Sequence, residues 1–374
     1  MEKEKRSKIT RITISGYKSI SPELPQSVAL GDINIVIGAN GAGKSNFVSF
    51  FKMLNFMMTG ELQTYVGRNG FAEDLLYFGS KKTQLIKASL EFKNEKKYTN
   101  VYTFSLVKTI QDSLIFSEEI IETNGKQFPL AGGQKESFLI SPDANYKNEQ
   151  VVKLILSRCR AFQFHDTSDN SYIRAYSDLS NDHWLTNNAG NLATILYRLK
   201  TATDFFPYYR RIVQFVQRVL PQLNDFYLEP QKNNPEKISL RWLQKGYPEY
   251  IMGPEQLSDG SIRFIALATL FLQPPELLPN VIIIDEPELG LHPQAVDILV
   301  TMMKMASQHT QIIAATQSAR LLNNFGVNDI IVAEMNRQKN ATEFKRLSEK
   351  ELDSWLEDYS LSELWEKNIL GGQP

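Results

Sequence analysis

The stretch Gly38-Ala39-Asn40-Gly41-Ala42-Gly43-Lys44-Ser45 has the G-x-x-x-x-G-K-S spacing of a phosphate-binding loop. The apolar run Ile33-Asn34-Ile35-Val36-Ile37 before it is typical of a buried strand, and the residues after it are typical of a helix. Glycines let successive backbone N–H groups turn toward one anion, and a helix N-terminus adds partial positive charge. A chance glycine-rich turn is the alternative, but strand, loop and helix together predict a nucleotide site.

The loop residues divide the phosphate chemistry among them. We expect Lys44 to meet the β- and γ-phosphates, and the Ser45 hydroxyl to hold Mg²⁺. The remaining contacts would come from the loop and the first helical residues, namely Gly38, Ala39, Asn40, Gly41, Ala42, Gly43, Lys44, Ser45 and Asn46.

Composition and charge set wider bounds. At 374 residues, with 42% hydrophobic and 22% charged residues, the chain has the make-up of a globular protein larger than one ordinary domain. The net charge of −1 gives no electrostatic argument for nucleic-acid binding, although it permits a local basic patch. One cysteine, Cys159, excludes an internal disulfide and is typical of a reducing compartment. No segment reaches the roughly 20 apolar residues of a membrane span, so we expect a cytoplasmic protein.

The pattern of apolar residues changes along the chain. Residues 9–15 alternate as a strand, and residues 85–140 contain short alternating runs that predict an antiparallel meander, the last of them at residues 138–140. Residues 191–199 and 208–220 show helical spacing and predict a helical lobe. The four histidines lack metal-ligand spacing, so zinc is not predicted.

A second buried strand carries acids at its end. The run Val281-Ile282-Ile283-Ile284-Asp285-Glu286 is typical of a parallel strand whose carboxyl end faces a ligand crevice. We expect Asp285 to orient Mg²⁺ and Glu286 to polarise the attacking water. Such a strand is a weak signal alone, but it is a strong one downstream of a phosphate loop.

The order of the motifs indicates a family. Leu257-Ser258-Asp259-Gly260-Ser261 lies between the loop and the acidic strand, and Leu289-Gly290-Leu291-His292-Pro293 follows them. This order resembles the ABC-type ATPases, specifically the RecF/SMC-like group that includes OLD-type and related ATPases of phage-defence systems. The family signature is Leu-Ser-Gly-Gly-Gln, and this chain departs from it at Asp259 and Ser261. The variant resembles the signatures of the non-transporter members.

The resemblance implies an α/β P-loop NTPase fold with an ABC-type head, an antiparallel β lobe and a helical lobe. It implies ATP and Mg²⁺ as ligands and a homodimer or higher oligomer with composite sites, in which Ser258 and Gly260 contact the γ-phosphate bound to the partner. The expected divisions are residues 1–165 for the first ATPase lobe, 166–250 for the helical lobe, 251–345 for the second ATPase lobe and 346–374 for C-terminal helices.

Two glutamines complete the expected site. Gln317 directly follows the run 312–316, at the position where the family has its switch histidine. Glutamine can hydrogen-bond a phosphate or water but cannot carry the charge of an imidazolium. Gln163 stands where the family's glutamine loop, a Mg²⁺ ligand, is expected; a surface polar residue is an equal alternative. Catalytic roles therefore fall to Lys44, Glu286 and Gln317.

We consider four functional hypotheses. The first is an ATP-dependent dimeric switch that regulates a separate effector protein in anti-phage defence, because about 40 residues after position 334 are too few for an appended nuclease domain, which needs on the order of 100 residues. The second is a DNA-repair or DNA-end-sensing ATPase of the RecF type. The third is structural nucleotide binding without hydrolysis, which Glu286 argues against. A transporter motor is disfavoured by the variant signature.

Overall fold

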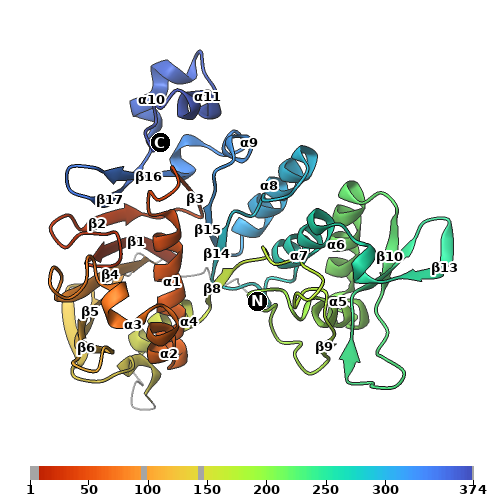
Figure 1. Ribbon diagram of the computed structural model, residues 1–374, viewed down its shortest axis with the longest axis horizontal. Coiled ribbons are helices and arrows are strands. Elements are labelled where there is room, and N and C mark those ends of the chain that lie inside the picture. Colours follow the sequence, from red (N-terminus) through yellow and green to blue (C-terminus); the bar gives the residue numbers. More distant parts are fainter. Residues whose placement is uncertain (1–7, 94–98, 142–146, 373–374) are drawn as a thin grey trace. The chain divides into compact units, whose positions relative to one another are not determined.

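Strand β3 (Ile33–Ile37) is buried along its whole length and lies at the centre of a mixed sheet (Figure 1). The sheet has the order β17-β16-β3-β15-β14-β8, with β15 and β16 parallel to β3 and β17 antiparallel to β16. Its other strands are β8 (Cys159–Phe162), β14 (Val281–Asp285), β15 (Gln311–Ala315), β16 (Ile330–Asn336) and β17 (Ala341–Arg346). Continuous apolar runs form the parallel strands because both of their faces are covered.

The computed structural model describes residues 8–93, 99–141 and 147–372. The chain divides into two compact units, which are described separately below. The first consists of Met1–Ala161, Asn280–Ile283 and Gln311–Pro374, and the second of Phe162–Pro279 and Ile284–Thr310. The expected segment 251–345 is therefore shared between both units, because β14 starts in the first unit and ends in the second.

A second sheet in the first unit is antiparallel, with the order β2-β1-β4-β5-β6-β7. Its strands are β1 (Lys8–Ser15), β2 (Gln26–Ala29), β4 (Leu85–Lys93), β5 (Thr99–Lys108), β6 (Leu114–Thr123) and β7 (Lys126–Ala131). The predicted meander is thus present, but Phe138–Ile140 is a short 3-10 helix, η1, and not a strand. The Ser137 hydroxyl accepts from Leu139 N, and the Glu119 carboxylate accepts from Phe138 N, which holds this turn.

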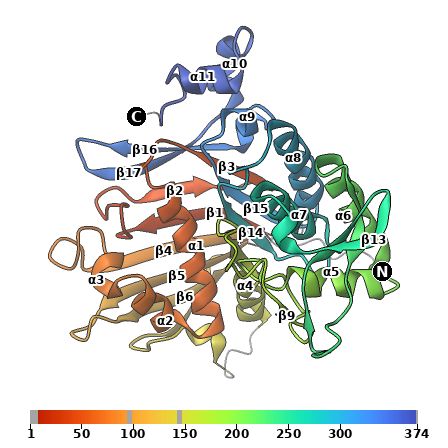
Figure 2. The ribbon, with the colours of Figure 1, turned by 45° about the vertical axis from the view of Figure 1, so that its right-hand side comes forward.

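Helix α1 (Lys44–Thr59) runs along a face of the antiparallel sheet (Figure 2). Phe47, Phe50 and Phe51 on this helix are buried in one cluster with residues of β4, β5 and β6. The unit also contains α2 (Leu62–Arg68), α3 (Phe71–Leu75), α4 (Lys147–Ser157), α9 (Ala319–Leu322), η3 (Val327–Asp329), α10 (Glu349–Leu356) and α11 (Leu361–Glu366). The C-terminal helices expected within residues 346–374 are α10 and α11, and β17 precedes them.

The second unit contains the predicted helices and several strands that were not predicted. Its helices are α5 (Leu192–Thr201), α6 (Phe206–Val219), η2 (Pro254–Gln256), α7 (Asp259–Leu272) and α8 (Pro293–Ser307). Its strands pair as β9 with β11 and as β10-β12-β13; they are β9 (Ser177–Asp178), β10 (Leu223–Tyr227), β11 (Lys237–Ile238), β12 (Arg241–Gln244) and β13 (Tyr247–Met252). Strands of two to six residues are too short to show a reliable period in the sequence.

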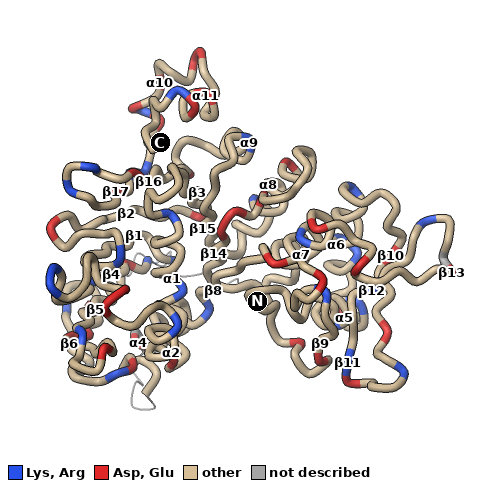
Figure 3. The backbone as a smooth tube through the Cα atoms, in the orientation of Figure 1, with Lys and Arg blue, Asp and Glu red and all other residues tan. Residues whose placement is uncertain are grey.

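Lys and Arg are interspersed with Asp and Glu along the described backbone of each unit (Figure 3). Among the described residues, no helix is both long and apolar enough to cross a membrane.

Candidate functional site

The phosphate loop connects β3 to α1, as the sequence predicts. Two of its glycines are required by close packing, Gly38 against backbone and Gly43 against a side chain. A Cβ at Gly38 would lie 2.3 Å from the Ala333 carbonyl oxygen, and one at Gly43 would lie 2.3 Å from Thr342 Oγ1. Gly43 also has φ 102°, in the left-handed region that favours glycine. The loop therefore packs directly on β16 and β17.

Lys44 is buried at the start of α1, and its ammonium group lies across the loop. Its Nζ donates to the carbonyl oxygens of Gly38, at 2.6 Å, and Ala39, at 2.9 Å. Ser45 is exposed in the first turn of the helix. A cation held among loop carbonyls and a hydroxyl beside it are the groups that phosphate and Mg²⁺ require.

Gln317 lies beside the loop within the first unit. Its Nε2 donates to Asn40 Oδ1 at 2.8 Å. The placement follows from sheet topology, because β15 runs parallel to β3 and both strands end at the same edge. Gln317 therefore has a position from which it can bond a phosphate or a water, the role that the sequence predicts for it.

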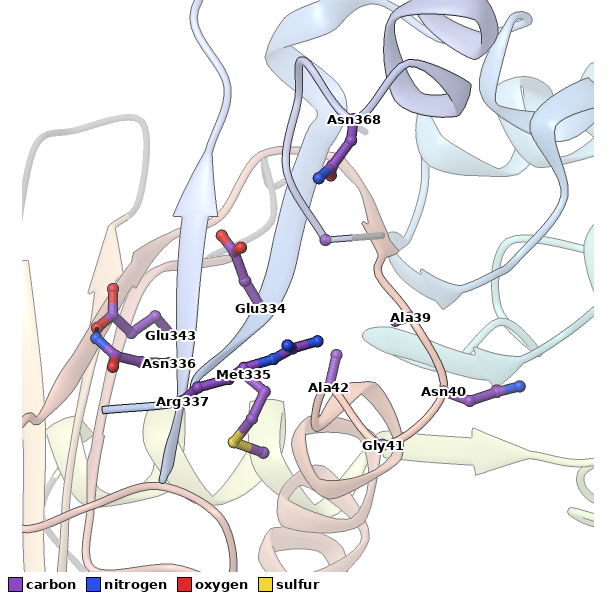
Figure 4. A pocket seen from close by; sticks show the side chains of 11 residues that line it. Ala39, Asn40, Gly41, Ala42, Glu334, Met335, Asn336, Arg337, Glu343 and Asn368 are labelled. Carbon is purple, nitrogen blue, oxygen red and sulfur yellow. Dashed lines mark hydrogen bonds between the residues drawn. The ribbon is translucent and has the colours of Figure 1, made fainter. Parts of the chain in front are cut away.

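A pocket of about 720 Å³ opens in front of the loop in the same unit. Figure 4 shows its side chains: that of Arg337 extends toward Ala42, those of Glu334 and Asn368 lie nearer the C-terminal segment, and Asn336 and Glu343 point toward each other. The Asn336 amide donates to Glu343 at 2.7 Å. The pocket is lined by Ala39, Asn40, Gly41, Ala42, Glu334, Met335, Asn336, Arg337, Glu343, Asn368 and Gly372.

In the second unit, β14 ends at the first predicted acid, Asp285, and the second, Glu286, follows it directly. Glu286 has φ 44°, a conformation that is uncommon for residues other than glycine and concentrates at functional sites. The carbonyl oxygen of Asp285 lies 2.9 Å from His165 Nε2, which must carry a proton because a carbonyl only accepts. Gln163 Nε2 lies 3.5 Å from His165 Nδ1, so Gln163, His165 and Asp285 form one chain of polar groups.

The signature residues open helix α7. Ser258 is its N-cap, and the Ser258 hydroxyl accepts from Ser261 N at 3.2 Å. A Cβ at Gly260 would lie 2.6 Å from the Gly290 carbonyl oxygen, so glycine is required by the close approach of the loop after β14. Both Ser258 and the start of the helix remain accessible, as a contact with a partner would require.

Asp259, the departure from the family signature, has its own partner. Arg174 Nη2 lies 2.9 Å from Asp259 Oδ1, and Arg174 also donates to the carbonyl oxygens of Thr167, Pro254 and Leu257. The hydrogen bond from Arg174 lowers the pKa of the Asp259 carboxyl. The substitution thus attaches the signature segment to the loop that contains Thr167.

Arg263 joins three segments of the second unit. Its side chain is 6% exposed, within the apolar face of α7. Its guanidinium donates to the carbonyl oxygens of Phe164, at 2.9 Å, of His165, at 3.1 Å, and of Leu289. Burial lowers the pKa of Arg263, but an arginine stays charged in proteins. One side chain on helix α7 therefore holds, by hydrogen bonds, the segment that follows Gln163 and the loop after β14.

The residues predicted for Mg²⁺ have suitable donor chemistry. The hydroxyl of Ser45, the carboxylate of Asp285 and the amide oxygen of Gln163 are oxygen donors, which Mg²⁺ prefers. Ser45 belongs to the first unit and the other two to the second. Their joint ligation of one ion remains a prediction.

Comparison with known proteins assigns the chain to a family. Residues 33–323 match the family described as an AAA domain, putative AbiEii toxin, Type IV TA system. The chain belongs to this family. The matched range contains the phosphate loop, the signature segment and the acidic strand. None of the curated proteins matches the chain.

Solved structures with a similar fold are heads of SMC proteins. The SMC head bound to the C-terminal winged-helix domain of ScpA aligns with a TM-score of 0.60 and 16% identity over 92% of this chain and 99% of that chain. The Pyrococcus furiosus SMC head bound to the C-terminal domain of ScpA aligns with a TM-score of 0.59 and 15% identity. That alignment covers 94% of this chain and 99% of that chain. The fold is thus that of an ABC-type P-loop ATPase head of the RecF/SMC-like kind.

Sequence reasoning missed three arginines that shape these sites: Arg174, Arg263 and Arg337. Arg263 gave a usable signal, because a charge inside the apolar run 262–272 is unusual unless it is paired. Arg174 and Arg337 stand in polar segments, where a solvated arginine is the ordinary expectation.

Proposed function

We propose that this protein binds and hydrolyses ATP with Mg²⁺ and works as a nucleotide-dependent dimeric switch on a separate effector protein. The observation that carries the proposal is the phosphate loop itself, with the Lys44 ammonium among its carbonyls and Gln317 bonded to Asn40. Membership of an ATPase family supports the nucleotide assignment.

Each residue would have one task in hydrolysis. The loop N–H groups and Lys44 bind the phosphates, Ser45 and Asp285 hold Mg²⁺, and Glu286 orients and polarises the attacking water. Bound Mg²⁺ supplies charge neutralisation at the phosphates. Gln317 positions the γ-phosphate or the water by hydrogen bonding and moves no proton, because an amide does not titrate.

The composite site explains why Ser258 and Gly260 are placed at an accessible helix start. A serine hydroxyl and backbone N–H groups at the start of α7 form an anion site, whereas one chain already has a phosphate loop of its own. We infer that they complete the site of a second copy, so that ATP joins two copies and hydrolysis releases them.

An effector partner is supported by two likenesses. The family description refers to a toxin and a toxin–antitoxin system, which is a two-component arrangement. The similar SMC head is bound to a domain of another protein, ScpA. By analogy, we propose that the two nucleotide states of this dimer present different surfaces to an effector, in anti-phage defence.

The test is a mixing experiment with two inactive variants. Lys44→Ala removes the phosphate cation, and Ser258→Arg blocks the partner's site while keeping the loop intact. Each alone should release no phosphate from ATP. Random mixing yields mixed dimers for half of the population, each with one intact site, so activity should return to about a quarter of wild type.

Two controls define the outcome of this test. Ser258→Arg must bind an ATP analogue like wild type in calorimetry, and Ser180→Arg, at an exposed turn of the same unit, should keep full activity. A mixture that recovers no phosphate release, although both variants fold and associate, contradicts the shared site.

A further inference from the structure

The C-terminal segment Asn368–Gly372 forms part of the pocket wall, although no motif in it indicates a nucleotide. Asn368 and Gly372 line the pocket together with the phosphate-loop residues Ala39–Ala42. A volume of about 720 Å³ lies within the range of roughly 300–1,000 Å³ of small-molecule sites. The pocket is therefore larger than the phosphate cradle and extends toward this segment.

Close packing holds the segment against the loop. Gly372 has φ 76°, and a Cβ there would lie 2.8 Å from Val332 Cγ1, 3.1 Å from the Ala333 carbonyl oxygen and 3.3 Å from Gly38 Cα. Gly38 is the first glycine of the phosphate loop and itself packs on Ala333. The chain after α11 is thus in contact with the backbone that binds phosphate.

Helix α11 connects this segment to α9, the short helix that follows Gln317. Asn323 Nδ2 donates to Ser362 Oγ at 2.7 Å, and Ser362 N donates to Asn323 Oδ1 at 2.8 Å. Asn323 caps the C-terminus of α9, which begins two residues after Gln317. Leu364 and Trp365 of α11 are buried. The wall therefore has a fixed position beside the loop.

Sheet order and charge indicate which part of a nucleotide this wall meets. Strand β16, which carries Glu334, borders β3 on the side opposite β15, whose end holds Gln317. A Cβ at Gly371 would lie 3.2 Å from Glu334 Oε2, so that carboxylate is next to the segment. A carboxylate repels phosphate but accepts hydrogen bonds from hydroxyl and amino groups. This end of the pocket suits an uncharged nucleoside.

We propose that Asn368 and Glu334 bind the nucleoside, through its ribose hydroxyls or base, of the nucleotide whose phosphates occupy the loop. An asparagine amide both donates and accepts, and a nucleoside offers both kinds of partner, whereas inorganic phosphates do not. The Arg337 guanidinium, which lines the same pocket and extends toward Ala42, can stack on the base. The inference rests on the proposed nucleotide binding and adds the residues that recognise the nucleoside.

The experiment compares ADP with inorganic tripolyphosphate by titration calorimetry on the full chain with Mg²⁺. Asn368 has φ 56°, so Asn368→Gly removes the amide without straining the backbone. We expect this variant to bind ADP about five- to tenfold more weakly, the effect of one lost hydrogen bond, and tripolyphosphate as wild type does. The matched control is Asn124→Gly, at φ 49° in the distant β6–β7 turn, which should change neither affinity.

Three results separate the possibilities. Unchanged ADP affinity in Asn368→Gly overturns the inference and leaves the proposed function standing. Equal weakening of ADP and tripolyphosphate also overturns it, because the segment would then only shape the loop. A wild-type chain that binds neither ligand contradicts the proposed function and the inference with it.

Hydrogen exchange provides a test that needs no variant. ADP should slow exchange of the backbone amides of residues 368–372 in the wild-type chain by several-fold, whereas tripolyphosphate should not. Equal protection by both ligands would show that phosphate contacts alone order the segment, which contradicts a nucleoside contact.

Discussion

The phosphate loop and the signature segment both depend on glycines packed against carbonyl oxygens, but they are held in place in different ways. In the loop, the lysine bonds to carbonyl groups five and six residues away. In the signature segment, Arg174 reaches Asp259 across 85 residues, and Arg263 reaches Phe164 across 99. The lysine bonds are thus local to the loop, although its glycines also pack on β16 and β17, whereas the arginine bonds of the signature segment join distant parts of the chain.

Because of this difference, we expect mutations in the phosphate loop and mutations of the arginines in the second unit to have different effects. In the proposed function the loop residues act directly on the phosphates, so changes there should abolish binding without disturbing the rest of the unit. The arginines of the second unit act through the positions of other segments. Changes there should loosen those segments and slow hydrolysis while nucleotide binding persists.

The largest effect is expected for Lys44→Ala. Removing the ammonium takes away charge-assisted hydrogen bonds to phosphate, worth about 1.5–3 kcal/mol each, so ATP affinity should fall on the order of a thousandfold. Calorimetry measures the affinity, and Lys52→Ala, farther along the same helix, is the control that keeps it. Unchanged affinity in Lys44→Ala would show that phosphate is bound elsewhere.

Glu286→Gln should have the next largest effect and should act on the rate alone. It keeps the shape of the side chain but removes the carboxylate that we propose polarises water, so hydrolysis should slow by about a hundredfold or more. ATP binding should stay intact, and dimers should accumulate with ATP in size-exclusion chromatography. Glu276→Gln, an exposed acid of the same unit, is the control. Wild-type phosphate release by Glu286→Gln would rule out its role as base.

The sequence predicts the parts of the site that are local. Residues 33–45 contain strand, glycines, lysine and serine in one run, so their local order can be predicted without knowing the tertiary contacts of the loop. Parallel pairing then places Gln317 beside Asn40. The bonds of Arg263 and the packing of Gly372 on Gly38 join residues far apart in the chain. Only the tertiary fold brings such residues together, so a single sequence does not reveal them.

Arg263→Met tests the hydrogen bonds by which Arg263 holds distant segments of the second unit. The change leaves the carbonyls of Phe164, His165 and Leu289 without this donor, and each buried unsatisfied group costs about 1–3 kcal/mol. We expect amide exchange in residues 163–166 and 286–292 to speed up at least about tenfold, and hydrolysis to slow while ATP affinity is kept. Arg210→Met, on an exposed face of α6, is the control. Unaltered exchange in these segments would show that Arg263 does not hold them.

The smallest effect is expected for the ion pair made by Asp259, which stands where the family signature has a glycine. Asp259 is largely exposed, at 69% for its side chain, so its pair with Arg174 is screened and should be worth about 0.5 kcal/mol. The hydrogen bond from Arg174 lowers the pKa of Asp259 in the folded state below the unfolded value of 3.8. Its contribution is therefore fully present above that value and is lost as pH falls through the folded pKa.

Asp259→Asn should therefore melt about 1 °C or less below wild type at neutral pH, and the two should converge as the pH falls below 3.8. Thermal melts across this pH range measure the difference, and Asp204→Asn, at an exposed turn of the same unit, removes the same charge without breaking the Arg174 pair. A difference that persists at low pH would mean that Asp259 acts through packing or capping of α7. The signature segment would then be held by its own residues, like the phosphate loop, and the contrast between the two regions would rest on Arg263 alone.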